Sequence, residues 1–320
     1  MLDPSELFEW TTTPALGDPV LVQALDGFVD AGGATRLARE HLLATLDSEV
    51  VATFDVDQLY DYRARRPEMI FATDHWESFK APVLAVHAVQ DAQGRSFLLL
   101  AGPEPDAQWE RFAAAVAVIV AELGVRLVIG LNSIPMGVPH TRPTTVIAHG
   151  SPRELVADYS NWLGTVQVPA SAGHLIEFRM AETDVASMGF AVNVPHYLAH
   201  LDYPDAAVTL LDHVARAADL QLPSDALQEA GDAIRAGVDE QVAGSEEVAN
   251  VVHALEKQYD EIVAGRGSGL VADGMPLPTA DELGAEFERY LSRQPGPGDS
   301  GSDPDGPTSN PSGPGPGDAS

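Results

Sequence analysis

The segment at residues 19–34 restricts the fold more than any other part of the chain. An apolar run, PVLVQAL, leads into the glycine-rich turn DGFVDAGGA. In the next segment, ATRLAREHLLATL, leucines recur at helical spacing, and the apolar run EVVATFD follows at 49–55. A strand, a glycine turn, a helix and a second strand in this order are typical of a βαβ unit in a parallel sheet. The chain is therefore predicted to have an α/β fold.

A second unit of the same kind follows. The runs PVLAVHAV (82–89) and RSFLLLAGP (95–103) flank the short turn QDAQG, which predicts a hairpin or paired strands. A helix, FAAAVAVIVAEL (112–123), ends at a glycine, and the strand VRLVIGL (125–131) begins directly after it. Two βαβ units are thus expected in one sheet.

Shorter sequence patterns predict the remaining helix and strands of the α/β domain. Residues 151–159 begin with serine and proline, which favours a helix start. The runs HLIEFRM (174–180) and MGFAVNVP (188–195) are predicted to be further strands.

From residue 204 onward the pattern becomes helical. The expected helices cover 204–220, 224–244, 245–265 and 279–293. The last residues are about half proline and glycine and lack large apolar side chains, so burial cannot offset the entropy of ordering them. We therefore expect an α/β domain at 1–220, a helical segment at 221–293 and a disordered, acidic tail at 294–320.

Charge and composition exclude several classes of function. The chain has 48 acids and 18 bases, a formal net charge of −30, which repels nucleic acid and anionic membranes. Its first residues, MLDPSELFEW, carry acids where a signal peptide would carry bases, so we expect a cytoplasmic protein. Cysteine is absent, which excludes disulfides, thiolate nucleophiles and cysteine-ligated metals.

The first glycine turn is a candidate binding site. Asp26, Gly27, Asp30 and Gly32 lie between a predicted strand and a helix N-terminus, where free backbone N–H groups can hold an anion. The glycine spacing matches neither a dinucleotide fingerprint nor a P-loop, and the two carboxylates would repel phosphate. The alternative interpretation is that the glycines serve the turn and Asp30 caps the helix.

A second candidate is the loop within GLNSIPMGVPHTRPTTVIAHG at 130–150. Arg142 can bind a carboxylate or phosphate with two hydrogen bonds, His140 can transfer a proton, and Asn132 can orient a ligand. Alternatively, Thr141 and Arg142 bond to the loop itself or contact a subunit. Because ligands of α/β proteins gather at the carboxyl ends of strands, we expect this loop and the first turn to share one polar surface.

Other sequence patterns give weaker evidence for a functional site. His196 and His200 have the i, i+4 spacing of zinc ligands, but the glutamate of an H-E-x-x-H motif is missing, so unliganded histidines are favoured. No G-x-S-x-G motif occurs, and we assign no catalytic residue, metal or cofactor. In 245–263, apolar side chains form one helical stripe, which must pack on the body of the chain or on a partner.

Three segments resemble the PAC2 family, whose members are similar to proteasome assembly chaperone 2. They are LDGFVDAGGA (25–34), LLLAGPEPDAQWERF (98–112) and the loop segment at 130–150. The resemblance implies a three-layer, mostly parallel α/β fold similar to purine nucleoside phosphorylases, here with an appended C-terminal helical segment. It also implies self-association into homo-oligomers.

The resemblance further implies a non-enzymatic, protein-binding or chaperone-type function, with the proteasome as the suggested partner. The alternative is an enzyme or sensor for nucleosides or phosphorylated metabolites on the phosphorylase-like fold. That alternative would use the first glycine turn and the region of Arg142.

Overall fold

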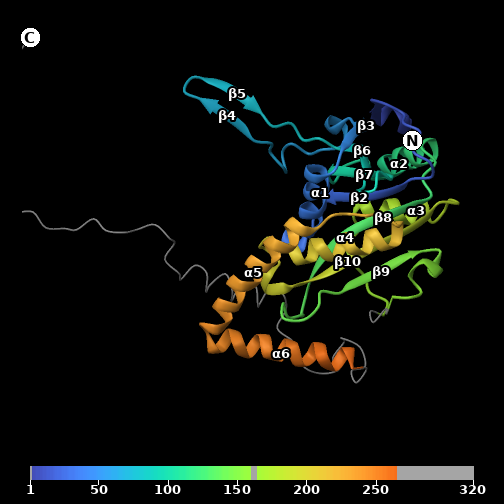
Figure 1. Cartoon of the computed structure of the whole chain (residues 1–320). Coiled ribbons are helices and arrows are strands. Elements are labelled where there is room, and N and C mark those ends of the chain that lie inside the picture. The colour runs from blue at the N-terminus through green and yellow to red at the C-terminus, as the bar shows by residue number, and fades with distance from the viewer. Residues whose placement is uncertain (1, 160–163, 265–320) are drawn as a thin grey trace, which may run out of the picture. The chain divides into compact units, whose positions relative to one another are not determined.

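The computed structural model describes residues 2–159 and 164–264 (Figure 1). All of them fall within one compact unit, Met1–Leu277. The predicted helix at 279–293 and the predicted disordered tail at 294–320 lie outside the described residues.

An eight-stranded mixed sheet forms the centre of this unit. Its neighbouring strands follow the order β1-β3-β6-β7-β2-β8-β10-β9. Five strands run in one direction, and β1, β6 and β9 pair antiparallel with their neighbours. The strands are β1 (Phe8–Trp10), β2 (Val20–Asp26), β3 (Ser48–Phe54), β6 (Ala85–Gln90), β7 (Ser96–Pro103), β8 (Leu127–Met136), β9 (Val146–Ser151) and β10 (Ala186–Pro195).

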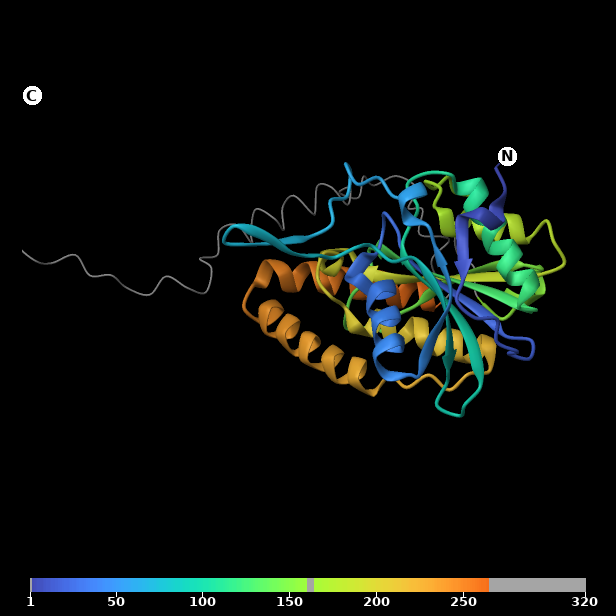
Figure 2. The ribbon, with the colours of Figure 1, turned by 90° about the horizontal axis from the view of Figure 1, so that it is seen from above.

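Helices cover both faces of the sheet, as Figure 2 shows. On one face, α1 (Ala34–Thr45) and α4 (Pro204–Ala218) enclose one hydrophobic core. On the other face, α2 (Trp109–Glu122) and α3 (Ala172–Met180) enclose a second. Both faces of the central strands are buried, which explains their nearly continuous apolar sequences. The predicted α/β fold with a mostly parallel sheet is confirmed.

Some predicted elements are confirmed and others are wrong. The hairpin β6–β7 and the strand at 188–195 are present. The predicted strand at 174–180 is helix α3, because Ser171 caps its N-terminus and Ala172, Ile176 and Met180 are buried at helical spacing. The predicted helix at 151–159 is only a short 3-10 turn, Arg153–Val156.

Two further helices follow α4. They are α5 (Asp225–Ala243) and α6 (Glu246–Val263). Val252 of α6 is buried, and Leu255 lies 3.8 Å from the position that a Cβ on Gly137 would occupy. The apolar stripe of α6 therefore packs on the chain's own loop between β8 and β9.

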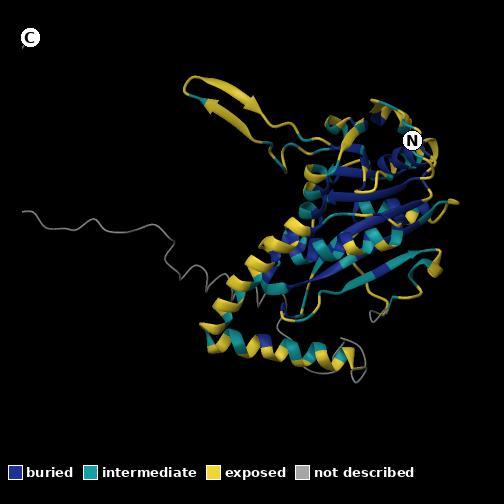
Figure 3. Ribbon diagram, viewed as in Figure 1, coloured by how far each residue is buried: buried dark blue, intermediate teal, exposed yellow. Residues whose placement is uncertain are grey.

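A two-stranded arm, β4 (Met69–Ala72) and β5 (His75–Phe79), extends away from the sheet between β3 and β6 (Figure 1). Nearly all of its residues are exposed (Figure 3). Among the described residues, no helix is both long and apolar enough to span a membrane.

Candidate functional site

The first turn and the later loop leave the sheet at the same edge. Strands β2 and β8 are parallel neighbours, with Gln23 opposite Gly130, so both segments follow carboxyl ends. Asp30 forms an isolated parallel bridge with Ser133, whose hydroxyl donates a hydrogen bond to Asp30 Oδ1 at 2.8 Å. The expectation that the two segments share an edge agrees with this geometry.

Within the first turn, both carboxylates are already engaged. Asp30 accepts hydrogen bonds from the backbone N–H groups of Thr35 (2.8 Å) and Arg36 (3.1 Å) at the start of α1. Asp26 Oδ1 lies 2.5 Å from a guanidinium nitrogen of Arg39. A carboxylate of the chain itself thus occupies the positive end of α1, where an anion would otherwise bind.

Of the two candidate glycines in this turn, Gly32 is required by the backbone geometry. Gly27 donates its N–H to Leu25 O at 2.9 Å, a bond that does not require glycine. Gly32 has a left-handed φ of 66°, and a Cβ there would lie 2.8 Å from Tyr203 Cβ. Gly32 also exchanges backbone hydrogen bonds with Ala199 and Tyr203, so it joins the turn to the start of α4.

The side chains of the later loop bind helix α6. Arg142 donates two parallel hydrogen bonds to Asp260, at 2.9 and 2.8 Å, and a third to Glu256 at 3.1 Å. Thr141 donates its hydroxyl to Glu256 at 2.6 Å, and Tyr259 donates to Pro143 O at 3.0 Å. The hydrogen bonding of Arg142 to the Asp260 carboxylate is the largest influence that raises the pKa of Arg142.

His140 binds helix α5 from a buried position. Its Nδ1 lies 2.6 Å from Tyr197 Oη, and its Nε2 lies 3.2 Å from Asp239 of α5. Burial raises the pKa of Tyr197, so its hydroxyl stays protonated at neutral pH. The loop residues His140, Thr141 and Arg142 therefore connect α5 and α6 to the sheet edge, instead of facing an open anion site.

Asn132 lies apart from these groups, on the opposite face of the sheet. Its Nδ2 is 3.3 Å from His174 Nε2 of α3. The eight candidate residues are thus near one edge but do not form one surface: Asp30 faces α1, the loop faces α5 and α6, and Asn132 faces α3.

A largely buried polar row on the α3 face, with His149 half-exposed at its outer end, was not predicted. Gln23, Gly130, Gly189 and His149 are paired in register across the neighbouring strands β2, β8, β10 and β9. Glu177 of α3 lies over the two glycines: a Cβ on Gly130 would overlap its Oε1, and one on Gly189 would lie 2.9 Å from the same atom.

The carboxylate of Glu177 joins the two ends of the row. Its Oε1 accepts a hydrogen bond from Gln23 Nε2 at 3.2 Å, and its Oε2 lies 2.7 Å from His149 Nε2. Burial lowers the pKa of His149, but the hydrogen bond and charge of Glu177 outweigh it, so the pKa is raised overall. The prediction of a strand at 174–180 concealed this row, because a strand residue would lie within a sheet, whereas Glu177 lies on a helix that covers the face of the sheet.

The two histidines considered for zinc do not share a helix face. His196 begins a 3-10 turn that ends at Leu198, and burial lowers its pKa. Within residues 2–159 and 164–264, no group of three or more His, Cys, Asp or Glu side chains is arranged to hold a metal ion.

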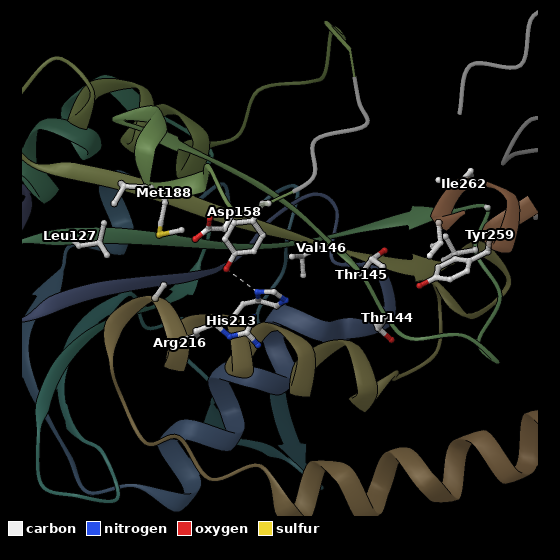
Figure 4. A pocket seen from close by; sticks show the side chains of 16 residues that line it. Leu127, Thr144, Thr145, Val146, Asp158, Met188, His213, Arg216, Tyr259 and Ile262 are labelled. Atoms are coloured by element: carbon white, nitrogen blue, oxygen red, sulfur yellow. Dashed lines mark hydrogen bonds between the residues drawn. The ribbon is translucent and has the colours of Figure 1, made fainter. Parts of the chain in front are cut away.

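A cavity of about 770 Å³ lies on the α4 face of the sheet, beside the edge strand β9 (Figure 4). Its walls come from the beginnings of β8 and β10, the loop at 137–145, β9, α4 and the end of α6. The loop that binds α6 thus also forms one wall of this cavity.

The fold and this edge define an α/β protein in which a loop at the carboxyl ends of the strands is bound to C-terminal helices. The chain matches the family model of the PAC2 family over residues 24–242, which is more than half of its length. The protein belongs to the PAC2 family.

Two solved structures with similar folds are bacterial proteins. Rv2714 of Mycobacterium tuberculosis, a protein of unknown function, is 50% identical with a TM-score of 0.77, covering 81% of this chain and 92% of that one. A Corynebacterium glutamicum protein of unknown function is 37% identical with a TM-score of 0.78, covering 82% and 99%.

A third structure, Rv2125 of Mycobacterium tuberculosis, is described as a proteasome-assembly chaperone homologue. It is 24% identical with a TM-score of 0.68 and covers 73% of this chain and 99% of that one. At 24% identity, this similarity shows that the two proteins share a fold and no more. No curated protein matches the chain.

Proposed function

We propose that this PAC2 family member is a non-enzymatic, cytoplasmic protein-binding factor of the chaperone type, which acts as a homo-oligomer. The observation that carries the proposal is the exposed arm β4–β5. An isolated two-stranded hairpin is marginally stable in water, so an arm of this kind is expected to pack on another protein surface.

The arm has the composition of a protein interface. Its large exposed apolar side chains are Met69 (49% exposed), Ile70 (57%), Phe71 (56%), Trp76 (63%) and Phe79 (52%). Phe71 and Trp76 stack edge to face across the two strands, with ring centroids 5.1 Å apart. Aromatic and methionine side chains are enriched at the centres of interfaces, where they supply large contact areas.

Charge favours a second copy of the chain as one occupant. Residues 60–80, YDYRARRPEMIFATDHWESFK, contain four bases and four acids, so this segment is neutral in a chain of net charge −30. Acidic surfaces of two copies repel each other, whereas a neutral, apolar arm with arginines at its base approaches an acidic surface without that cost. This contrast supports self-association through the arm.

The test compares the assembled mass of the wild type with that of the double variant Phe71→Ser/Trp76→Ser. We expect light scattering coupled to size exclusion to show an oligomer for the wild type and a monomer for the variant. Phe178→Ser is the matched control, because Phe178 is also an exposed aromatic residue (61%) but lies on α3. A monomeric wild type, or an unchanged mass for the arm variant, contradicts the proposal.

The proteasome is the partner class to test first, since a structure of the same fold is described as a proteasome-assembly chaperone homologue. Purified 20S proteasome core and its separate subunits would be mixed with the protein and analysed by native mass spectrometry. We expect a complex that the arm variant or a shielding salt concentration weakens. If neither the core nor its subunits bind, the proteasome-related part of the proposal is wrong, while self-association is judged separately.

The alternative, a phosphorylase-like site for a nucleoside or phosphorylated metabolite at the first turn, receives little support from the geometry. Asp30 satisfies the N–H groups at the start of α1, and Arg142 is bound by Asp260 and Glu256. A phosphate would have to displace these carboxylates.

A further inference from the structure

The cavity lies beside β9, and within the described part of the chain no α-helix makes extensive contact with that strand. Strand β9 is the edge strand of the sheet, and α4 packs mainly on the neighbouring β10 and β8. Helix α6 stands opposite, held by its bonds to the loop at 137–145. The space between them is about 770 Å³, within the range of about 300–1,000 Å³ that is usual for small-molecule sites.

Most of the cavity wall is apolar, and Figure 4 shows how its side chains are arranged. Leu127 and Met188 lie at one end, Val146 lies in the middle, and Tyr259 and Ile262 lie at the other end. An elongated apolar molecule could therefore follow β9 from α4 toward α6.

One neutral hydrogen-bonding pair lies in this wall. Tyr159 Oη is 3.1 Å from His213 Nδ1, and both rings pack against Phe190 at centroid distances of 5.6 and 5.2 Å. Burial, followed by the charge of Arg216, lowers the pKa of His213, and burial raises the pKa of Tyr159. Both groups are uncharged at neutral pH and can orient a polar head group.

Two charged side chains in the cavity wall bear on the net charge of a ligand that can bind there. Arg216 of α4 is the single arginine or lysine in the lining, and no ion pair joins it to another described residue. Asp158 is the single carboxylate in the lining. The single guanidinium can pair with one carboxylate. Repulsion by Asp158 and by the acidic chain grows with the charge of the ligand, so it opposes a phosphate dianion more strongly than a monoanion.

We propose that this cavity binds an amphipathic monocarboxylic acid, such as a medium-chain fatty acid. The carboxylate lies at Arg216, close to the Tyr159–His213 pair, and the apolar chain lies along Val146 toward Ile262. This site goes beyond the proposed protein-binding function and does not depend on it.

Isothermal titration calorimetry with hexanoate, octanoate, decanoate and octanamide tests the proposal on the full chain. In the wild type we expect the Kd of the acids to tighten about fourfold for each added methylene group. Octanamide should bind about tenfold more weakly than octanoate, because it cannot form a charge-assisted hydrogen bond with Arg216.

Two variants separate the head group from the chain. Arg216→Gln should abolish the preference for octanoate over octanamide and keep the dependence on chain length. Ala217→Leu, which fills part of the cavity, should weaken the acid and the amide alike. Arg153→Gln is the matched control, since Arg153 is also exposed but lies outside the lining, and it should change neither quantity.

Three results would overturn the inference. They are the absence of binding for all acids in the wild type, equal affinities for octanoate and octanamide, and equal losses in Arg216→Gln and Arg153→Gln. Each can occur whether or not the arm mediates self-association, so failure here is distinguishable from failure of the proposed function.

Discussion

Replacing Gly130 by alanine tests whether the polar row fixes α3 on the sheet. The new Cβ would overlap Glu177 Oε1 and lie 2.8 Å from Gln23 Nε2. Glu177 cannot move away freely, because its other oxygen lies 2.7 Å from His149 Nε2. The substitution must therefore break the contact with His149 or lift α3 from the sheet.

The expected cost follows from the crowding. Overpacking a filled interior costs about 1–3 kcal/mol, and here the displaced group is a buried carboxylate, so we expect about 2 kcal/mol. In the background Glu177→Ala the carboxylate is gone, and the amide of Gln23, the other close group, can move into the space that it leaves. There, Gly130→Ala should be neutral or stabilise by about 0.5 kcal/mol, because alanine restricts the unfolded chain more than glycine does. The coupling free energy of the two substitutions is then about 2 kcal/mol.

Urea denaturation of the wild type, both single variants and the double variant, followed by circular dichroism at pH 7, measures this coupling. If Gly130→Ala costs the same free energy in both backgrounds, the glycine is not there to admit Glu177. The described geometry of the row would then be refuted, even if each variant alone is destabilised.

Further predictions concern the charged pairs. Since the pKa of His149 is raised in the folded protein, its protonated form stabilises the fold below the unfolded pKa of about 6.5. This contribution is lost as the pH rises from the unfolded pKa through the folded pKa. His149→Gln should therefore show a flatter decline of stability over that interval in urea titrations, and parallel curves would contradict the raised pKa. Arg142→Gln should accelerate hydrogen exchange in α6, whereas Arg153→Gln should not, and equal exchange in both would show that the loop does not hold the helix.

The sheet could be predicted from sequence because its strands are buried on both faces. Apolar, β-branched runs bounded by glycine turns identify such strands without knowledge of their partners. The strand order was not accessible in the same way. Strands β2 and β3 flank one helix and run parallel, yet β6 and β7 lie between them, since nothing in the local pattern encodes which strands pair.

Helix α3 shows where local pattern reading fails. The run HLIEFRM is short and rich in apolar residues, and short apolar runs do not distinguish a strand from a buried helix turn. The distinguishing signal was Ser171, which accepts a hydrogen bond from the backbone N–H of His174 as an N-cap. Reading that cap would have placed Glu177 on the helix side that faces the sheet, and with it the polar row.

The loop candidates His140, Thr141 and Arg142 were chosen by polarity and by position after a predicted strand, and they do follow β8. Asn132 instead lies within that strand. The partners of the loop residues were what the sequence could not supply. Arg142 is bound by Asp260, 118 residues later, and His140 by Asp239, 99 residues later. A polar loop that bonds to other parts of its own chain and a polar loop that binds a ligand have similar compositions. Only the position of the distant acidic residues in the fold distinguishes them.

The two proposed surfaces lie toward opposite edges of the sheet, which makes their independence testable. The arm connects β3 and β6, near the edge formed by β1, whereas the cavity adjoins β9 at the other edge. A ligand shifts an assembly equilibrium only through a difference in its affinity for the two states, and no described contact joins the arm to the cavity wall. Octanoate should therefore leave the assembled mass unchanged, and Phe71→Ser/Trp76→Ser should keep the octanoate affinity of the wild type. A change in either quantity would show that the sheet, whose central strands are buried on both faces, transmits a rearrangement between its edges.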